Sequence, residues 1–198
     1  TTLWLASFVF QTAGIVLILM RGAIYDFVSI VISNMLIVAG AVFFLHGLIR
    51  FTDIKFSKFQ NYLMMALFFI AYSYFTLITP SLTMRNILFS FSVIFVSLQC
   101  SWILPRKVTP VTREIYRGAG LVFILYTLLY LIRIITNIKY PQVSSLFSSV
   151  VVDAALIIIS QMLGITLTFS LVMMINGRLF YELNLYSEER EKMVGELR

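Results

Sequence analysis

The sequence predicts an all-α protein: a polytopic transmembrane helix bundle with six visible spans, followed by a helix that leaves the membrane. Three observations predict this fold. Hydrophobic residues make up 60% of the 198 residues and charged residues only 12%, with a mean hydropathy of +0.95, whereas a soluble domain is about a quarter charged. The hydrophobic residues form continuous runs, and crossing a bilayer takes about 20 such residues per helix. The charges stand mostly between these runs and in the C-terminal segment.

Six apolar runs follow one another along the chain. Each run is continuous rather than alternating, which favours helices over the strands of an outer-membrane barrel. Turn residues and charges separate the runs, in segments such as RGAIYD and RFTDIKFSK. Because membrane helices bury their polar faces only against one another, we expect one bundle in residues 1–176 and a separate exit helix in residues 177–198. The runs cover residues 3–20, 28–49, 60–79, 87–104, 119–138 and 147–175.

Basic residues are distributed unevenly between the two sides of the expected bundle. With six spans, both termini and the second and fourth loops share one side, and the positive-inside rule places that side in the cytoplasm. These topology signals account for the net charge of +6, so we expect the lipid bilayer and no nucleic acid as a partner. The cytoplasmic side carries 11 basic residues, Arg50, Lys55, Lys58, Arg106, Lys107, Arg113, Arg117, Arg178, Arg190, Lys192 and Arg198, and the other side carries 4, Arg21, Arg85, Arg133 and Lys139.

The C-terminal segment continues the sixth run without a proline and changes composition. Its apolar residues follow a 4-3-4-3-4 spacing, which is typical of the seam of a coiled coil, with one arginine in the seam. Glu, Lys and Arg flank this seam, so we expect a signalling helix that pairs two chains into a homodimer. The alternative is an amphipathic tail that lies on the lipid headgroups. The seam residues are Leu179, Leu183, Tyr186, Arg190, Met193 and Leu197.

The stretch RGAIYDFVSIVISNMLIVAGAVFFLHGLIRF, residues 21–51, resembles the N-terminal membrane region of bacterial GGDEF diguanylate cyclases and sensor histidine kinases. In that group an arginine-rich turn and an Asp-aromatic-x-Ser-Ile sequence open a helix that closes on Gly-Leu-x-x-Phe. The resemblance implies a sensory module of the bacterial inner membrane, one further span upstream, and PAS, GGDEF or kinase domains downstream. The similar residues are Arg21, Asp26, Phe27, Ser29, Ile30, Asn34, Gly47, Leu48, Phe51, Pro80, Arg85, Arg133, Met174, Asn176, Arg178, Leu179, Glu182 and Leu183.

Catalytic and metal-binding patterns are not found in the sequence. His46 is the only histidine, and zinc sites need several Cys, His or carboxylate ligands. Cys100 is the only cysteine and is expected to be a packing residue. We therefore expect neither an enzyme active site nor a cofactor in this segment, and interpret His46 as a polar residue near the membrane interface.

Two charges fall within the apolar runs. Arg133 lies in the fifth run and Asp153 in the sixth, at similar distances from the loop that joins them. A lone charge at such a depth costs about 2–3 kcal/mol on the insertion scale, and sequential antiparallel helices usually touch. We therefore predict an Arg133–Asp153 ion pair. It either stabilises the fold or couples a ligand site to the exit helix.

A polar stripe near the outer end of the second run contains Asp26, Ser29, Ser33 and Asn34 at helical intervals. Serine and asparagine often join helices within membranes. The functional interpretation is a site for an unknown small ligand in the outer half of the bundle, to which Arg85, placed in the third loop, would contribute. The candidate ligand or signal residues are Asp26, Asn34, Arg85, Arg133 and Asp153.

The function that these features favour is a membrane sensor that passes an extracytoplasmic or membrane signal through its last helix to a cytoplasmic output domain. The alternative is a small transporter or channel subunit, and a third interpretation is a structural assembly subunit. Transporters favour inverted repeats and helices broken near the midplane. The four prolines instead lie in loops or at the ends of runs.

Overall fold

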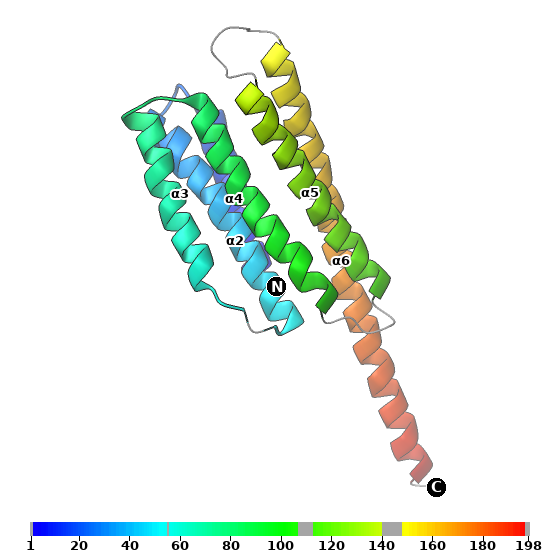
Figure 1. The fold of residues 1–198 in the computed structure, drawn as a ribbon. Helices are drawn as coiled ribbons and strands as arrows, with labels where there is room; N and C mark the ends of the chain where they lie inside the picture. Colours follow the sequence, from blue (N-terminus) through cyan, green and yellow to red (C-terminus); the bar gives the residue numbers. More distant parts are fainter. Residues whose placement is uncertain (1, 55, 107–112, 140–147, 197–198) are drawn as a thin grey trace.

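The computed structural model describes residues 2–54, 56–106, 113–139 and 148–196, and the secondary structure of these residues is helical (Figure 1). The predicted helical class is therefore confirmed. The elements are α1 (Thr2–Leu19), the π-helix η1 (Phe27–Ile32), α2 (Ser33–Thr52), α3 (Phe59–Leu77), α4 (Leu82–Ile103), the short 3-10 helix η2 (Leu104–Arg106), α5 (Arg113–Lys139) and α6 (Ser148–Glu196).

Five segments of the described chain are long and apolar enough to cross a membrane, as expected of a membrane protein. The expected third span, α3, is not among them although it has 19 residues. Polar residues near both ends of α3 lower its mean hydropathy. They are Gln60 and Asn61 in the first turn and Tyr72, Ser73 and Tyr74 near the last turn. The five segments are Thr2–Leu19, Phe27–Thr52, Leu82–Ile103, Tyr116–Lys139 and Ile158–Met193.

The helices run alternately up and down the bundle. Helix α1 packs along α2, α4 packs against α2, α3 and α5, and α6 packs mainly along α5. Segments of four helices meet at one end of the bundle. They are the first turn of α1, the last turn of α2, the first turn of α5, and the part of α6 that follows its apolar stretch. We call this the exit end, because α6 leaves the bundle there (Figure 1), and the opposite end the far end.

Helix α6 is a single helix of 49 residues. At 1.5 Å per residue it is about 74 Å long, more than twice the roughly 30 Å thickness of a hydrocarbon core. Leu171 and Met174 are its last buried residues and belong to the main core of the bundle. Beyond Arg178, which still contacts α2, helix α6 extends away from the bundle toward the C-terminus (Figure 1). The expected continuity between the sixth span and the exit helix is thus observed.

The predicted coiled-coil seam is exposed on this part of α6. The apolar side chains of the seam are between 55% and 70% exposed, namely Leu179, Leu183, Tyr186 and Met193. The side chain of Arg190 is exposed as well. Leu197 lies outside the described residues. The seam is accessible to a partner in the single chain, and the homodimer stays a prediction.

Candidate functional site

Arg85 belongs to a helix rather than to a loop, which corrects the placement expected from the sequence. Ser81 caps α4, and its hydroxyl accepts a hydrogen bond from the Met84 amide at 3.3 Å. This cap starts the helix one turn earlier than the apolar run, since Ser81 supplies the acceptor that the first turn lacks. Arg85 therefore sits in the first turn of α4 and is half-buried at the far end.

Three arginines lie within electrostatic range of one tyrosine at the far end. Tyr72 on α3 is only 5% exposed, and the charges of Arg85, Arg133 and Arg21 contribute, at longer range, to the electrostatic environment of its hydroxyl group. The Arg133 guanidinium also lies 6.0 Å from the centre of the Tyr130 ring. Arg85 and Arg133, two of the predicted ligand residues, thus lie at the same end of the bundle, and their role in binding a ligand stays a prediction. Arg21, which is not among the predicted ligand residues, lies at this end as well.

The polar stripe of the second span bonds within its own helix. Ser33 donates its hydroxyl hydrogen to the Ser29 carbonyl at 2.6 Å, and the Asn34 amide donates to the Ile30 carbonyl at 2.7 Å. Ser29 and Ser33 are buried, Asn34 is half-buried, and the Asp26 side chain is exposed. These bonds accompany the π-helical turn of η1, a geometry that often occurs at functional sites. The described bonds of the stripe thus do not join neighbouring helices.

The predicted Arg133–Asp153 ion pair stays a prediction. Helices α5 and α6 pack along one another, as the pair requires. The backbone of Asp153 belongs to α6, but its side chain lies outside the described residues.

Two polar links between helices were not foreseen from the sequence. The Asn86 amide on α4 donates to the Asn137 side-chain carbonyl on α5 at 3.2 Å, and Asn137 is 4% exposed. The Tyr126 hydroxyl on α5 donates to the backbone carbonyl of Ser160 on α6 at 2.8 Å. Asparagine in an apolar run is a signal for such links, but the sequence does not specify the partner helix.

The exit end holds an aromatic junction between four helices. The Phe51 ring at the end of α2 lies 5.4 Å from Trp4 on α1 and 6.4 Å from Tyr116 on α5, measured between ring centres. The guanidinium of Arg178 on α6 lies 5.1 Å from the centre of the Phe51 ring. We call Trp4, Phe51, Tyr116 and Arg178 the exit junction. It is where the long helix is held to the rest of the bundle.

Arg178 also binds the backbone at the end of α2. Its Nη1 donates to the Phe51 carbonyl at 3.1 Å. Helix α2 ends at Asp53, whose left-handed φ of 51° stops the helix. The last carbonyls of a helix have no partner in the helix and carry partial negative charge, so a cation is favourable there. Arg178 supplies both the donor and the charge.

Trp4 fixes the other side of the junction. Its indole Nε1 donates to the Phe44 carbonyl at 3.3 Å. The indole lies so close to Gly47 that a Cβ at this position would be 2.5 Å from it. A real side chain does not fit at such a distance, so the glycine allows α1 to approach α2 at the junction.

His46 and Cys100 have the surroundings of packing residues. The His46 ring is 7% exposed and lies 5.7 Å from the Tyr62 ring, between ring centres. Cys100 is fully buried in the main core. In the part of the chain that the structure describes, no three His, Cys, Asp or Glu residues gather into a possible metal site.

No protein-family model, curated protein sequence or solved structure matches the chain.

Proposed function

We propose that the chain is the input module of a bacterial signal-transduction protein of the inner membrane. In this proposal the bundle perceives an extracytoplasmic or membrane signal, and α6 carries it to a cytoplasmic output domain, a diguanylate cyclase or a histidine kinase. The observation that carries the proposal is α6 itself. One helix of 49 residues contacts α5 in the bundle, binds the end of α2 through Arg178, and continues beyond the exit end.

A single continuous helix of this kind can carry a movement from the bundle directly to a domain that follows it. A helix transmits rotation, tilt or axial shift because its backbone hydrogen bonds keep it rigid along its length. An exposed helix with an apolar seam can pair two chains, which suits an output domain that works as a dimer. The alternative of a transporter is less well supported, since α1, α3, α4, α5 and α6 run unbroken between their ends.

We propose six crossings, with the exit end in the cytoplasm. Helices α2 and α4 both run from the far end to the exit end, so α3 must return over the same length, about 28 Å at helical rise. No charged residue interrupts α3, and Leu63, Leu67 and Ile70 on its outer face are 47% to 65% exposed. Cysteines introduced at positions 113 and 139, the two ends of α5, test the orientation. A membrane-impermeant thiol reagent added outside should label position 139 only, and labelling of position 113 alone would refute it.

The far end is the proposed ligand site. Arg21, Arg85 and Arg133 come from three different segments and act on the same buried tyrosine hydroxyl. Such a group of cations suits a small ligand with an anionic group, because guanidinium groups bind carboxylates and phosphates in pairs of hydrogen bonds. Asp26, Asn34 and Asp153 remain candidates for contacts to other parts of that ligand.

The exposed seam of α6 is proposed to pair two chains. Single cysteines placed along residues 179–193 should form disulfides between chains with maxima about every 3.5 residues, at Leu179, Leu183, Tyr186 and Met193. Positions between them, such as Phe180 and Leu185, serve as controls. A profile without this period would exclude the coiled coil and favour the tail on the membrane surface.

The signalling role is tested by fusing residues 1–198 to the catalytic domain of a diguanylate cyclase. The connecting helix is then lengthened one residue at a time. If α6 transmits rotation into a coiled coil, product formation should rise and fall with a period of about seven residues. Equal activity in every fusion, at equal amounts of protein in the membrane, would contradict the proposal.

A further inference from the structure

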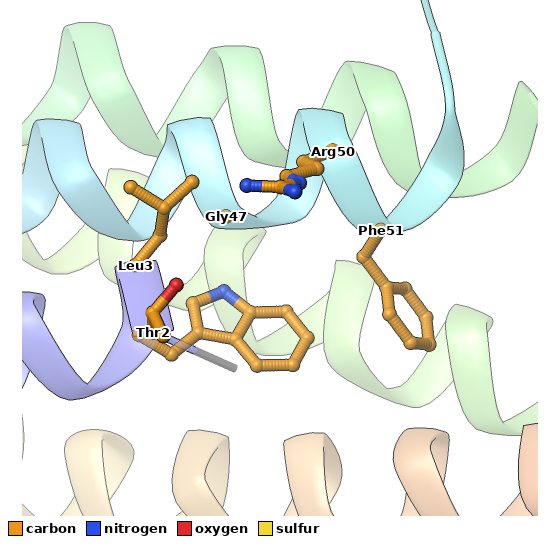
Figure 2. A pocket seen from close by; sticks show the side chains of 6 residues that line it. Thr2, Leu3, Gly47, Arg50 and Phe51 are labelled. Carbon is orange, nitrogen blue, oxygen red and sulfur yellow. The ribbon is translucent and has the colours of Figure 1, made fainter.

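A cleft of about 400 Å³ opens between the start of α1 and the last turns of α2, at the exit end (Figure 2). Figure 2 shows the Arg50 guanidinium extending over Gly47 toward the start of α1, where Thr2 and Leu3 lie across from it. The cleft borders the exit junction, because two junction residues form part of its wall. The lining residues are Thr2, Leu3, Trp4, Gly47, Arg50 and Phe51.

The chemistry of the lining suits a phosphate group beside an apolar group. Arg50 is the one charged residue among the described residues that line the cleft, and its side chain is exposed. Thr2 offers a hydroxyl group, and the other lining side chains are aliphatic or aromatic. A guanidinium binds phosphate through two parallel hydrogen bonds. The guanidinium of Arg178 lies 5.1 Å from the centre of the Phe51 ring and adds a second positive charge near this cleft residue.

The position of the cleft suits a lipid rather than a soluble phosphate. Helix α1 has 18 residues and is about 27 Å long, close to the thickness of a hydrocarbon core, so its first turn lies at headgroup level. From the cleft toward the middle of the membrane, α1 exposes Leu5 by 67%, Phe8 by 41% and Val9 by 60%. An acyl chain beside this face would remain in contact with apolar side chains, while the headgroup reaches Arg50.

We propose that this cleft binds the phosphate of an anionic phospholipid, with Arg50 as the main phosphate contact, Thr2 as a second donor and the exposed face of α1 as the acyl-chain contact. Basic pockets between membrane helices bind lipid headgroups in this way. The site stands whether or not the chain transmits a signal. Its position also gives the bound lipid direct access to Phe51, the residue that α6 holds.

The test uses Trp4 as the reporter, since it lines the cleft. The chain contains two tryptophans, so the substitution Trp102→Phe leaves Trp4 alone. The protein is reconstituted into vesicles of phosphatidylcholine that contain either brominated phosphatidylglycerol or brominated phosphatidylcholine, because bromine quenches nearby indole fluorescence. One basic residue near a membrane surface strengthens the binding of an anionic lipid about fivefold. We therefore expect brominated phosphatidylglycerol to quench Trp4 at about one fifth of the concentration that brominated phosphatidylcholine needs.

Arg50→Gln should abolish this fivefold preference, and Arg50→Lys should keep most of it. Arg117→Gln is the matched control, because Arg117 is an exposed basic residue at the same end that does not line the cleft. The unchanged emission maximum of Trp4 verifies that each variant is folded. Equal quenching by the two lipids, or an equal loss of preference in Arg117→Gln, overturns the proposal.

Two further outcomes also overturn it and identify the alternative. Displacement of brominated phosphatidylglycerol by added inorganic phosphate would mean that the site takes a soluble anion rather than a lipid. Failure of both brominated lipids to quench Trp4 would mean that protein covers the cleft. Neither outcome bears on the fusion experiment that tests signalling, so the two proposals fail independently.

Discussion

The α1–α2 pair and the α5–α6 pair are both antiparallel and sequential, yet they are packed in different ways. In the most apolar stretches, 56% of the residues of the second span and 17% of those of α1 are buried, against 33% in α5 and 11% in α6. The second span is the most buried because it also packs against α3 and α4. Helix α1 approaches α2 over glycines that leave no room for a side chain: a Cβ would lie 2.6 Å from the Ser33 carbonyl at Gly14 and 2.9 Å from the Ser7 carbonyl at Gly40. In the α5–α6 pair, a Cβ at Gly118 or Gly120 would meet nothing within 4 Å, and a Cβ at Gly164 would lie 3.1 Å from the Tyr126 hydroxyl, which is a side-chain end rather than backbone.

This difference separates a pair of helices in close backbone contact from a pair that packs through its side chains. The α1–α2 pair forms a close-packed frame, and its position is determined by backbone contacts along its length. Helix α6 is attached by individual side chains, among them Tyr126 to the Ser160 carbonyl and Arg178 to the Phe51 carbonyl. We propose that α6 has two arrangements, bound or released at the end of α2, without any change in the frame. The proposed signalling mechanism needs that property.

The largest effect is expected from Gly14→Ala, which forces a methyl group against the Ser33 carbonyl. We expect a loss of about 1–3 kcal/mol in the free energy of unfolding, the usual cost of overpacking, measured by denaturant unfolding in detergent. Gly120→Ala is the control, and it should be neutral or stabilising by up to about 1 kcal/mol because it removes a helical glycine with open surroundings. Equal stability of the two variants would remove the distinction between frame and attached helix.

A smaller effect on stability is expected from Arg178→Ala, which removes the cation from the end of α2. The loss should be about 1 kcal/mol, as for other charges at helix termini. Spin labels at Tyr62 and Phe180, which are both exposed, report the position of α6 against the bundle. Their distance distribution should broaden in Arg178→Ala and remain unchanged in Arg190→Ala, since Arg190 lies on the part of α6 that has left the bundle. Broadening in both variants would argue against the junction.

The smallest effect is expected from Tyr126→Phe, which removes the hydroxyl that binds the Ser160 carbonyl. Hydrogen bonds between membrane helices contribute about 0.6 kcal/mol on average, so the free energy of unfolding should fall by roughly that amount. Tyr181→Phe changes an exposed tyrosine beyond the bundle and should have no measurable effect. A loss of several kcal/mol in Tyr126→Phe would mean that α6 is as firmly packed as α1.

The helices themselves were largely predictable, because hydropathy and length determine them. The expected run at 119–138 lies within α5, and the run at 147–175 continues into α6 as expected. The start of α4 was placed too late because Ser81 acts through a single hydrogen bond that hydropathy does not register. Helix α3 has the expected position and length but a lower hydropathy than its neighbours.

The sites were less predictable, because their members come from distant parts of the chain. Arg85 and Arg133 were predicted as ligand residues and lie at the same end, whereas the electrostatic contribution of Arg21 depends on where the first loop lies in space. Asn34 looked like a link between helices but bonds to its own helix. The sequence indicated Arg178 as a basic residue of the cytoplasmic side and as part of the family resemblance, not as a contact of α2. Its contact with Phe51 depends on where α2 ends, and the left-handed backbone conformation of Asp53 determines the position of this end.

The central claim is that changes at the far end reach the output through the attachment of α6 to α2. The most direct measurement compares the activity of the diguanylate cyclase fusion in four variants: the parent, Arg133→Gln, Arg178→Ala and the double variant, each normalised to folded protein in the membrane. Arg133→Gln should shift the activity in the parent by changing the balance between attached and released α6. In the Arg178→Ala background α6 is already released, so the same substitution should leave the activity unchanged. An equal shift in both backgrounds, which is what independent sites give, would contradict the account.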